Sequence, residues 1–363
     1  MRLLVLDENF EILGDASMFQ TLIWTRRYKS LGMYELHVTK DKFPLINSGK
    51  YLYRNDADEL GIIEEPHYSI DDKGTREIYC KGYFAEKILE DRVLNRTFRM
   101  SGNLEDSFRS MVTEYAIFPA ESERKIVNLR LGDLSGLSQT VDCQRTGSSV
   151  SEALYDVGNS YDVSHRIRYV FQSDELLFEV WKGKDRRDSQ TENSWAVFSD
   201  SFCNIRNTAY NRNSTEYKNF AYIAGAGEGT DRVIVTVDLR VEGEELRELY
   251  VDARDLAQDD GEGNVTPMEK YQEQLKQRGR EKLAEHRLVE TVSGGVDPNA
   301  NLMYRRDFDL GDLCTYVNTE IGVVTEKRIT EITETYEGGR QTLDIVFGDD
   351  EVSTIKQLIR KGA

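Results

Sequence analysis

In the first part of the chain, short runs of β-forming residues alternate large and small side chains. Turn residues separate these runs. Thr21–Tyr28 is dense in β-formers, and its large alternating side chains are Leu22, Trp24, Arg26 and Tyr28. Because successive side chains of a strand point to opposite faces, this spacing places all four on one face. Further strand-like runs are Met1–Leu6, Gly32–Val38, Tyr51–Tyr53, Gly61–Ile63 and Glu77–Gly82. Short strands at this spacing are typical of a barrel or a sandwich.

A helical period follows in the next stretch of the chain. Apolar residues at steps of three and four predict a helix over residues 104–115. Ser149, with Glu152 three residues later, is an N-terminal capping pattern and predicts a helix over residues 148–157. The β-forming runs Arg166–Phe171 and Glu175–Trp181 enclose a turn signal, which predicts a hairpin. We therefore expect a small α+β unit at about residues 100–195.

The rest of the chain is predicted to be mainly β, with one long helix. Strands are expected at Asn204–Tyr210, Asn219–Ala224, Asp231–Val241, Leu313–Val317, Gly322–Tyr336 and Gln341–Phe347. Thr266 is the expected N-cap of the helix, Pro267 its first residue, and Glu269 completes a capping box. This helix is expected to run to about Leu288, and a short one to lie around residues 354–360. The predicted fold class is α+β, mainly β.

Composition narrows the class of protein. The chain has 363 residues, which is enough for two or three domains, and a net charge of −18. Hydrophobic residues at 39% and aromatic residues at 10% argue against disorder. No apolar run approaches the roughly 18 residues of a membrane span, and Asp7 comes too early for a secretory signal. The negative net charge also argues against nucleic-acid binding, because phosphate contacts need clustered Lys and Arg.

Cysteine and histidine spacing gives no metal or redox signature. Cys80, Cys143, Cys203 and Cys314 are far apart in the sequence, and no two form a CxxC motif. Reduced and mostly buried thiols are the expected state. The four histidines form no HxxxH or HExxH motif. We therefore expect no bound metal, no cofactor and no catalytic centre.

Three polar motifs allow more than one interpretation. Gly225–Gly229 has the spacing GxGxG, and a strand follows it, so a turn between strands is favoured over a phosphate-binding loop. Asp259–Asn264 does not follow the register of a calcium loop, which favours a solvated acidic loop. Arg26 and Arg27 could be an exposed strand pair or could bridge to acidic neighbours across a subunit boundary.

Four stretches, taken in order, resemble a known family. They are Leu22–Tyr28 with Gly32–Leu36, Lys81–Arg92, Ala221–Arg232, and Asp307–Asp312 with Ile329–Ile332 and Val346–Gly348. The chain resembles the tail-hub family of long-tailed bacteriophages and prophages, also called baseplate-hub or tail-associated proteins. The family-like motif residues are Trp24, Arg26, Arg27, Tyr28, Gly225, Gly227, Gly229, Asp231, Arg232, Asp309, Gly311 and Asp312.

The resemblance implies a fold with two tube-type β-barrel domains. Residues 1–98 would form the first barrel, completed by residues 198–245, and residues 99–197 would be an inserted α+β domain. Residues 246–363 would form the second barrel, with a helix at 266–289. Leu131–Asp133 and Leu310–Asp312 share three letters, which is chance level, so the sequence itself shows no duplication.

The resemblance also implies a structural role in the virion. Similar proteins form homotrimeric rings at the tail tip, which join a six-fold tail tube to three-fold tip components. The implied partners are distal tail or tail-tube proteins, the tape-measure protein, and tail fibre or tip proteins, after assembly in the bacterial cytoplasm. DNA would pass through the ring without specific binding, and we hypothesise that an acidic wall repels its phosphates. No membrane insertion is expected.

Two rival functions stay open at this point. A tail-associated hydrolase acting on peptidoglycan or glycan would need a carboxylate pair or a Cys–His centre in a cleft. A host-carbohydrate binding module would use exposed aromatic residues, and the chain has 19 Tyr and 3 Trp. Aromatic residues in strands more often serve packing, so we favour the structural role.

Overall fold

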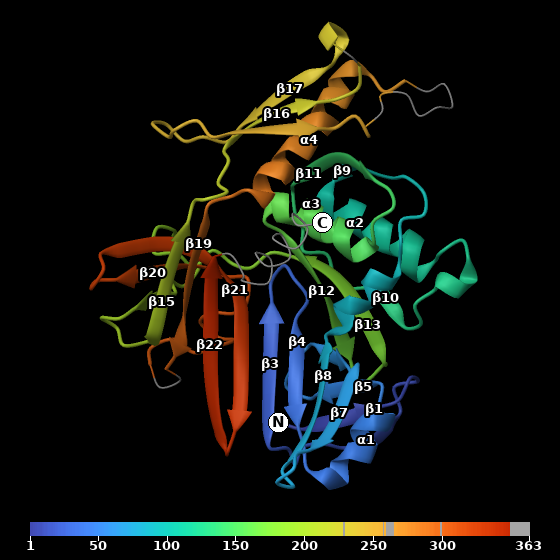
Figure 1. The fold of residues 1–363 in the computed structure, drawn as a ribbon, viewed down its shortest axis with the longest axis vertical. Helices are drawn as coiled ribbons and strands as arrows, with labels where there is room; N and C mark the ends of the chain where they lie inside the picture. Colours follow the sequence, from blue (N-terminus) through green and yellow to red (C-terminus); the bar gives the residue numbers. More distant parts are fainter. Residues whose placement is uncertain (228, 257, 259–264, 298–299, 349–363) are drawn as a thin grey trace.

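The computed structural model describes residues 1–227, 229–256, 258, 265–297 and 300–348 (Figure 1). Over these residues the chain is mainly β with a few helices, which confirms the α+β class. The predicted acidic loop Asp259–Asn264 and the predicted helix at residues 354–360 lie outside the described residues. Among the described helices, none combines the length and the hydropathy needed to cross a bilayer.

Residues 1–83 contribute strands to two sheets that face each other across one core. The first sheet has the order β2-β1-β5-β6. Its strands are β1 (Leu3–Leu6), β2 (Ile12–Asp15), β5 (Tyr51–Arg54) and β6 (Leu60–Ile62). The second sheet includes β3 (Thr21–Arg27), β4 (Met33–His37), β7 (Glu65–Ile70) and β8 (Arg76–Tyr83), and η1 (Lys40–Lys42) and α1 (Phe43–Ser48) lie between β4 and β5. The four residues predicted to share one face, Leu22, Trp24, Arg26 and Tyr28, are each at most 6% exposed, so this face is a buried one.

The predicted α+β unit is present between η2 (Ala85–Asp91) and Trp181. Its helical elements are α2 (Leu104–Val112), the π turn η3 (Thr113–Ile117), η4 (Ser122–Arg124) and α3 (Val150–Tyr161). Its strands are β9 (Phe98–Asn103), β10 (Leu129–Leu131), β11 (Thr140–Arg145), β12 (Ser164–Val170) and β13 (Glu175–Trp181). The Ser149 side chain accepts a hydrogen bond from the Glu152 amide at 3.0 Å, so the predicted N-cap is confirmed. The predicted hairpin is also confirmed, because β12 pairs antiparallel with β13.

Strands from the two ends of the chain lie side by side in one large sheet. Its main order is β15-β19-β22-β21-β3-β4-β8-β7. The added strands are β14 (Val197–Ser199), β15 (Ile205–Asn213), β19 (Val289–Val296), β20 (Leu313–Asn318), β21 (Val323–Glu337) and β22 (Arg340–Gly348). The red β21 pairs antiparallel with the blue β3, with Glu331 opposite Arg27 and Glu337 opposite Thr21 (Figure 1). Within the described residues no sheet closes into a ring of paired strands, because β3 and β21 pair and join the strands of both chain ends into one open sheet.

A separate small unit lies at one end of the molecule, and we call it the peripheral unit. It consists of β16 (Phe220–Ala224), β17 (Ile234–Asp238), β18 (Glu248–Asp252) and α4 (Met268–Glu285), with η5 (Gly229–Asp231) after the glycine cluster (Figure 1). The sheet order is β17-β16-β18, and apolar residues of all three strands pack with Tyr271 and Leu275 of α4. The predicted turn between two strands at Gly225–Gly229 is therefore confirmed.

Two details of this region differ from the predictions. Pro267 occupies the N-cap position of α4, which makes no side-chain capping hydrogen bond, so the assignment of Thr266 as the cap was wrong. The Thr266 hydroxyl instead lies within hydrogen-bonding distance of Arg99. In the described residues β16 pairs with β17 and with β18, and these strands add nothing to the sheets of residues 1–98. The domain boundaries stay a prediction.

Candidate functional site

Two of the predicted motifs meet in space although nearly 300 residues separate them. Arg26, on the inward face of β3, donates to Asp309 at 2.7 Å and to Glu59 at 2.6 Å. Arg26 is only 6% exposed, so its interpretation as an exposed strand residue was wrong. Arg27 points to the other face and pairs with Glu331 of β21 at 2.7 Å. The acidic partners of both arginines lie within the same chain.

A second buried arginine extends this arrangement. Arg54 of β5 is 1% exposed and donates to Glu334 at 2.7 Å and to Asp56 at 2.8 Å. Its guanidinium lies 5.4 Å from the ring centre of Trp24 and 5.1 Å from that of Tyr336. We call the set Arg26, Arg54, Glu59, Asp309 and Glu334 the joint, because it connects the first two sheets to β21 and the loop before β20.

The Glu59 carboxylate of the joint is held in its charged form. Burial alone would raise the pKa of Glu59, but Arg26 beside it brings that pKa below its ordinary value. Sequence reasoning missed Arg54, Glu59 and Glu334. Arg54 follows the buried Leu52 by two positions, and Glu334 follows the buried Ile332 by two. Extending the strand alternation by one step would have placed both of them in the interior.

Gly311 and Asp312 form a packing point next to the joint. Gly311 has φ 82°, and a Cβ there would lie 2.8 Å from the rings of both Trp181 and Tyr28. Asp312 is buried and accepts from Arg186 at 2.6 Å. These contacts bring the loop before β20 against β3 and β13, so this predicted motif is a meeting point of three chain segments.

The remaining predicted motif lies elsewhere, in the peripheral unit. A Cβ at Gly225 would lie 2.5 Å from the Tyr271 hydroxyl, which itself accepts from the Ala226 amide at 2.8 Å. Gly227 has φ 101°, a conformation that favours glycine, and Gly229 and Asp231 belong to η5. Arg232 donates to Asp252 at 2.7 Å. These residues anchor a turn on α4, and the structure does not bring them near the joint.

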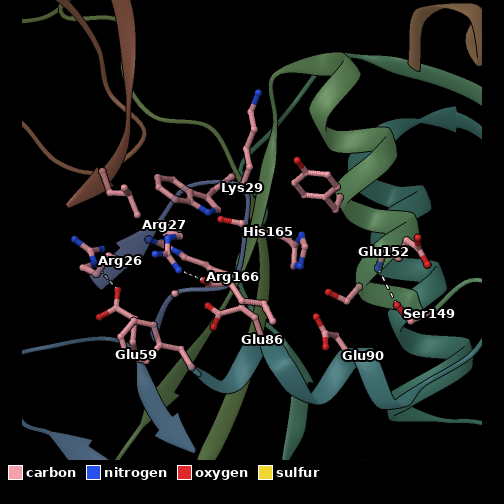
Figure 2. Close-up of a pocket in the computed structure, with 18 residues that line it drawn as sticks. Arg26, Arg27, Lys29, Glu59, Glu86, Glu90, Ser149, Glu152, His165 and Arg166 are labelled. Carbon is pink, nitrogen blue, oxygen red and sulfur yellow. Dashed lines mark hydrogen bonds and ion pairs between the residues drawn. The ribbon is translucent and has the colours of Figure 1, made fainter. Parts of the chain in front are cut away.

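A cavity of about 330 Å³ opens beside the joint, between β3, η2, α3 and the β12–β13 hairpin. Figure 2 shows Glu86 and Glu90 projecting from η2, with Glu152 on α3 and Arg27 on the side of β3. His165 and Arg166 enter from β12. Arg166 is already held by Glu179 at 2.8 Å, and Lys29 donates to Asn159 at 3.1 Å.

Glu86 and His165 are the perturbed groups of this cavity. One carboxylate oxygen of Glu86 accepts from the Ile167 amide at 3.1 Å, and the other has no hydrogen-bond partner. Burial raises the pKa of Glu86 to about 7. Burial also lowers the pKa of His165 to about 4. The cavity thus holds a carboxyl group that can exchange a proton near neutral pH, and no single motif in the sequence indicates it.

The cysteines are mostly buried, as expected from the sequence. Cys80, Cys143 and Cys314 are buried and Cys203 is exposed, and all four are free. Within the part of the chain that the structure describes, no three His, Cys, Asp or Glu side chains gather as a metal site requires.

The arrangement as a whole is shared with solved tail proteins of phages and prophages. Prophage tail protein gp18 from Listeria monocytogenes EGD-e matches with TM-score 0.57 and 15% identity, over 99% of each chain. The 43 kDa tail protein of prophage MuSo2 from Shewanella oneidensis matches with TM-score 0.58 and 10% identity, over 96% of this chain and 98% of that one. The tail protein from Neisseria meningitidis MC58 gives TM-score 0.56 and 13% identity, over 97% and 98%.

These likenesses define the class of fold, and a family model defines the family. The model of the Siphovirus ReqiPepy6 Gp37-like protein matches residues 2–349. The chain therefore belongs to the Siphovirus ReqiPepy6 Gp37-like family. A search of curated proteins finds no match.

Proposed function

We propose that this protein is a structural component of the tail of a phage or prophage. The observation that carries the proposal is that the family match covers residues 2–349. The fold shared with three tail proteins over at least 96% of this chain supports it independently of sequence. Its location would then be the virion tail, after assembly in the host cytoplasm.

Within the tail, we propose the role of hub, a homotrimeric ring at the tip that joins a six-fold tube to three-fold components. The large sheet supports this role, because its two halves meet at the β3–β21 pair. Each half would contribute one tube-type barrel, so that three subunits present six similar units around a channel. The proposed neighbours are a distal tail or tube protein, the tape-measure protein, and fibre or tip proteins.

The chemistry of the cavity favours a structural role over catalysis. Its arginines Arg26, Arg27 and Arg166 are already paired with carboxylates of the same chain. Such pairs fix neighbouring segments and leave little charge to bind a substrate. We therefore keep the proposal of a non-catalytic protein.

An acidic channel is part of the same proposal. The net charge of −18 would let DNA slide past without the counterion release that makes phosphate binding strong. Reversing channel-facing acids to lysine in an assembled ring should slow genome ejection. Ejection at the normal rate in such variants would remove the acidic wall from the account and leave the tail role intact.

The tail role itself is tested by conditional loss of the protein. Particles grown without it should have absent or incomplete tails, and supplying the protein in trans should restore complete tails in electron micrographs. An epitope tag on the restoring copy should be labelled at the distal end of the tail. Complete, infective tails without the protein would overturn the proposal.

A further inference from the structure

A groove of about 780 Å³ separates the peripheral unit from α3 of the α+β unit. Four consecutive residues of β18, Leu249–Asp252, line it. Because consecutive side chains alternate between faces, such a run shows that the edge of the strand, not one face, borders the groove. Among the described strands β18 pairs only with β16, so this edge has no strand partner. An unpaired strand edge in a groove is a common place for another segment to bind.

The groove is acidic, and part of its wall is apolar. Its lining holds five carboxylates against three Lys or Arg residues. The carboxylates are Glu152, Asp156, Asp252, Glu281 and Glu285, and the cations are Arg145, Arg278 and Lys282. Apolar and aromatic surface comes from Tyr155, Leu249 and Val251. A complementary segment would combine basic side chains with aliphatic ones.

The chain itself contains such a segment, which follows β22 after the acidic residues Asp349, Asp350 and Glu351. Residues 354–363 include Lys356, Arg360 and Lys361 and no acidic residue. Ile355, Leu358 and Ile359 give this segment its aliphatic side chains. This segment also lies beyond the family match, which ends at residue 349.

The last described strand runs toward the groove. β22 is antiparallel to β19, with Asp344 opposite Gly295 and Gly348 opposite Thr291. β19 follows α4, whose C-cap His286 lines the groove, so β22 runs back in the direction of that helix end. Thr291 is five residues from His286, which corresponds to about 17 Å of extended chain. Residues 349–363 can span roughly 50 Å when extended, so they have ample reach.

We infer that the groove between α3, α4 and the edge of β18 binds residues 354–363 of the same subunit. The bound segment contacts elements of both the peripheral unit and the α+β unit and ties them together. This adds to the contacts that α4 already makes with the α+β unit, such as Arg145 with Glu281 at 2.5 Å. The inference does not depend on the proposed role in a phage tail.

Photo-crosslinking in the full chain tests this inference. Benzoylphenylalanine in place of Leu358 should link to peptides from α3, β18 or the C-terminal half of α4, identified by mass spectrometry. Mixing isotopically light and heavy chains separates links within one subunit from links between subunits. Links to the groove within one chain support the inference. It is overturned by links only between chains, by links only to other surfaces, or by the absence of groove peptides among the products.

A matched pair of charge reversals on α4 tests the electrostatic part. Glu285 lines the groove and pairs with Lys282, whereas Glu273 is outside it and pairs with Lys276 in the same spacing. Glu285→Lys should lower the yield of groove crosslinks by about threefold at low salt, the scale of one partly exposed charge contact. Glu273→Lys should leave the yield unchanged. Equal yields in the two variants would contradict the charge complementarity.

Discussion

The joint and the peripheral unit use charge in opposite ways. In the joint, Arg54 and Glu334 are 1% and 2% exposed and connect strands that are distant in the sequence. In the peripheral unit, ion pairs such as Arg240 with Asp238 lie on the surface, outside an apolar core formed by the sheet and α4. Buried pairs are sensitive because removing one partner leaves the other charged and desolvated. Exposed pairs contribute little, since water already solvates both groups.

The difference explains why similar-looking motifs have different roles. Arg26 and Asp309 hold two ends of the chain together, so their removal should affect the whole fold. Gly225 and Arg232 shape one turn on α4, so changes there should stay local. The predictions below test this contrast on single residues.

The largest effect is expected from the buried pair of the joint. Glu334→Ala should lower the free energy of unfolding by about 3–5 kcal/mol, because it removes the buried carboxylate that faces the buried Arg54. Glu326 lies on the same strand but in a partly exposed pair with Arg187. Glu326→Ala should cost less than about 1 kcal/mol. Urea denaturation of both variants measures the contrast, and equal losses would contradict it.

The packing point at Gly311 should give the next largest effect. Gly311→Ala should cost about 2–4 kcal/mol, because it combines an unfavourable φ of 82° with contact against Trp181 and Tyr28. Gly338 also has positive φ, at 56°, but open space around it. Gly338→Ala should cost only about 1 kcal/mol. Thermal unfolding compares the two, and a similar shift in Tm for both would argue against tight packing at Gly311.

The cavity beside the joint predicts an unusual pH dependence. The pKa of Glu86 is about 7 in the folded chain, against an ordinary value of 4.5. Between pH 4.5 and 7 the folded state therefore keeps a proton on Glu86 that the unfolded state has released. Stability is therefore lost as pH rises from 4.5 to 7. Glu86→Gln should remove this loss and be more stable than the wild type at pH 8 by about 1–3 kcal/mol.

His165 has the opposite effect on the pH dependence of stability, so the two groups can be distinguished. Its pKa of about 4 in the folded chain lies below the ordinary 6.5, so the unfolded state binds a proton first as the pH falls. Stability from this group is lost between pH 6.5 and 4. The Glu86→Gln variant should thus still lose stability as the pH falls from 6.5 to 4, because of His165. It should no longer lose stability as the pH rises from 4.5 to 7. An unchanged profile from pH 4 to 8 would contradict the burial of Glu86.

The smallest and most local effect is expected in the peripheral unit. Tyr271→Phe removes a hydroxyl that donates to the Leu256 carbonyl and accepts from the Ala226 amide, both at 2.8 Å. The expected cost is about 1–2 kcal/mol. Hydrogen exchange should accelerate in β16–β18 and stay unchanged in β3 and β21. Acceleration throughout the large sheet would contradict the independence of the two regions.

Local structure could be predicted from the sequence, whereas the pairing of strands and the contacts of distant side chains could not. Period-two alternation placed Trp24 and Arg26 on one face of a strand, and the Ser149 capping pattern located α3. Alternation and capping patterns are local and do not determine which strands pair. The pairing of β3 with β21 therefore could not be predicted from the sequence. Glu86 is buried because β12 covers it, and a single stretch of sequence does not show that. Thr266 is not the N-cap of α4, because the N-cap position is one residue later, at Pro267.

Electron cryo-microscopy of intact tails tests the central claim most directly. The account predicts three copies of this chain at the distal end of the tail, arranged around an axial channel, with the two halves of the large sheet alternating around it. Absence of the chain from purified tails, or its presence as a single copy away from the axis, would contradict the account.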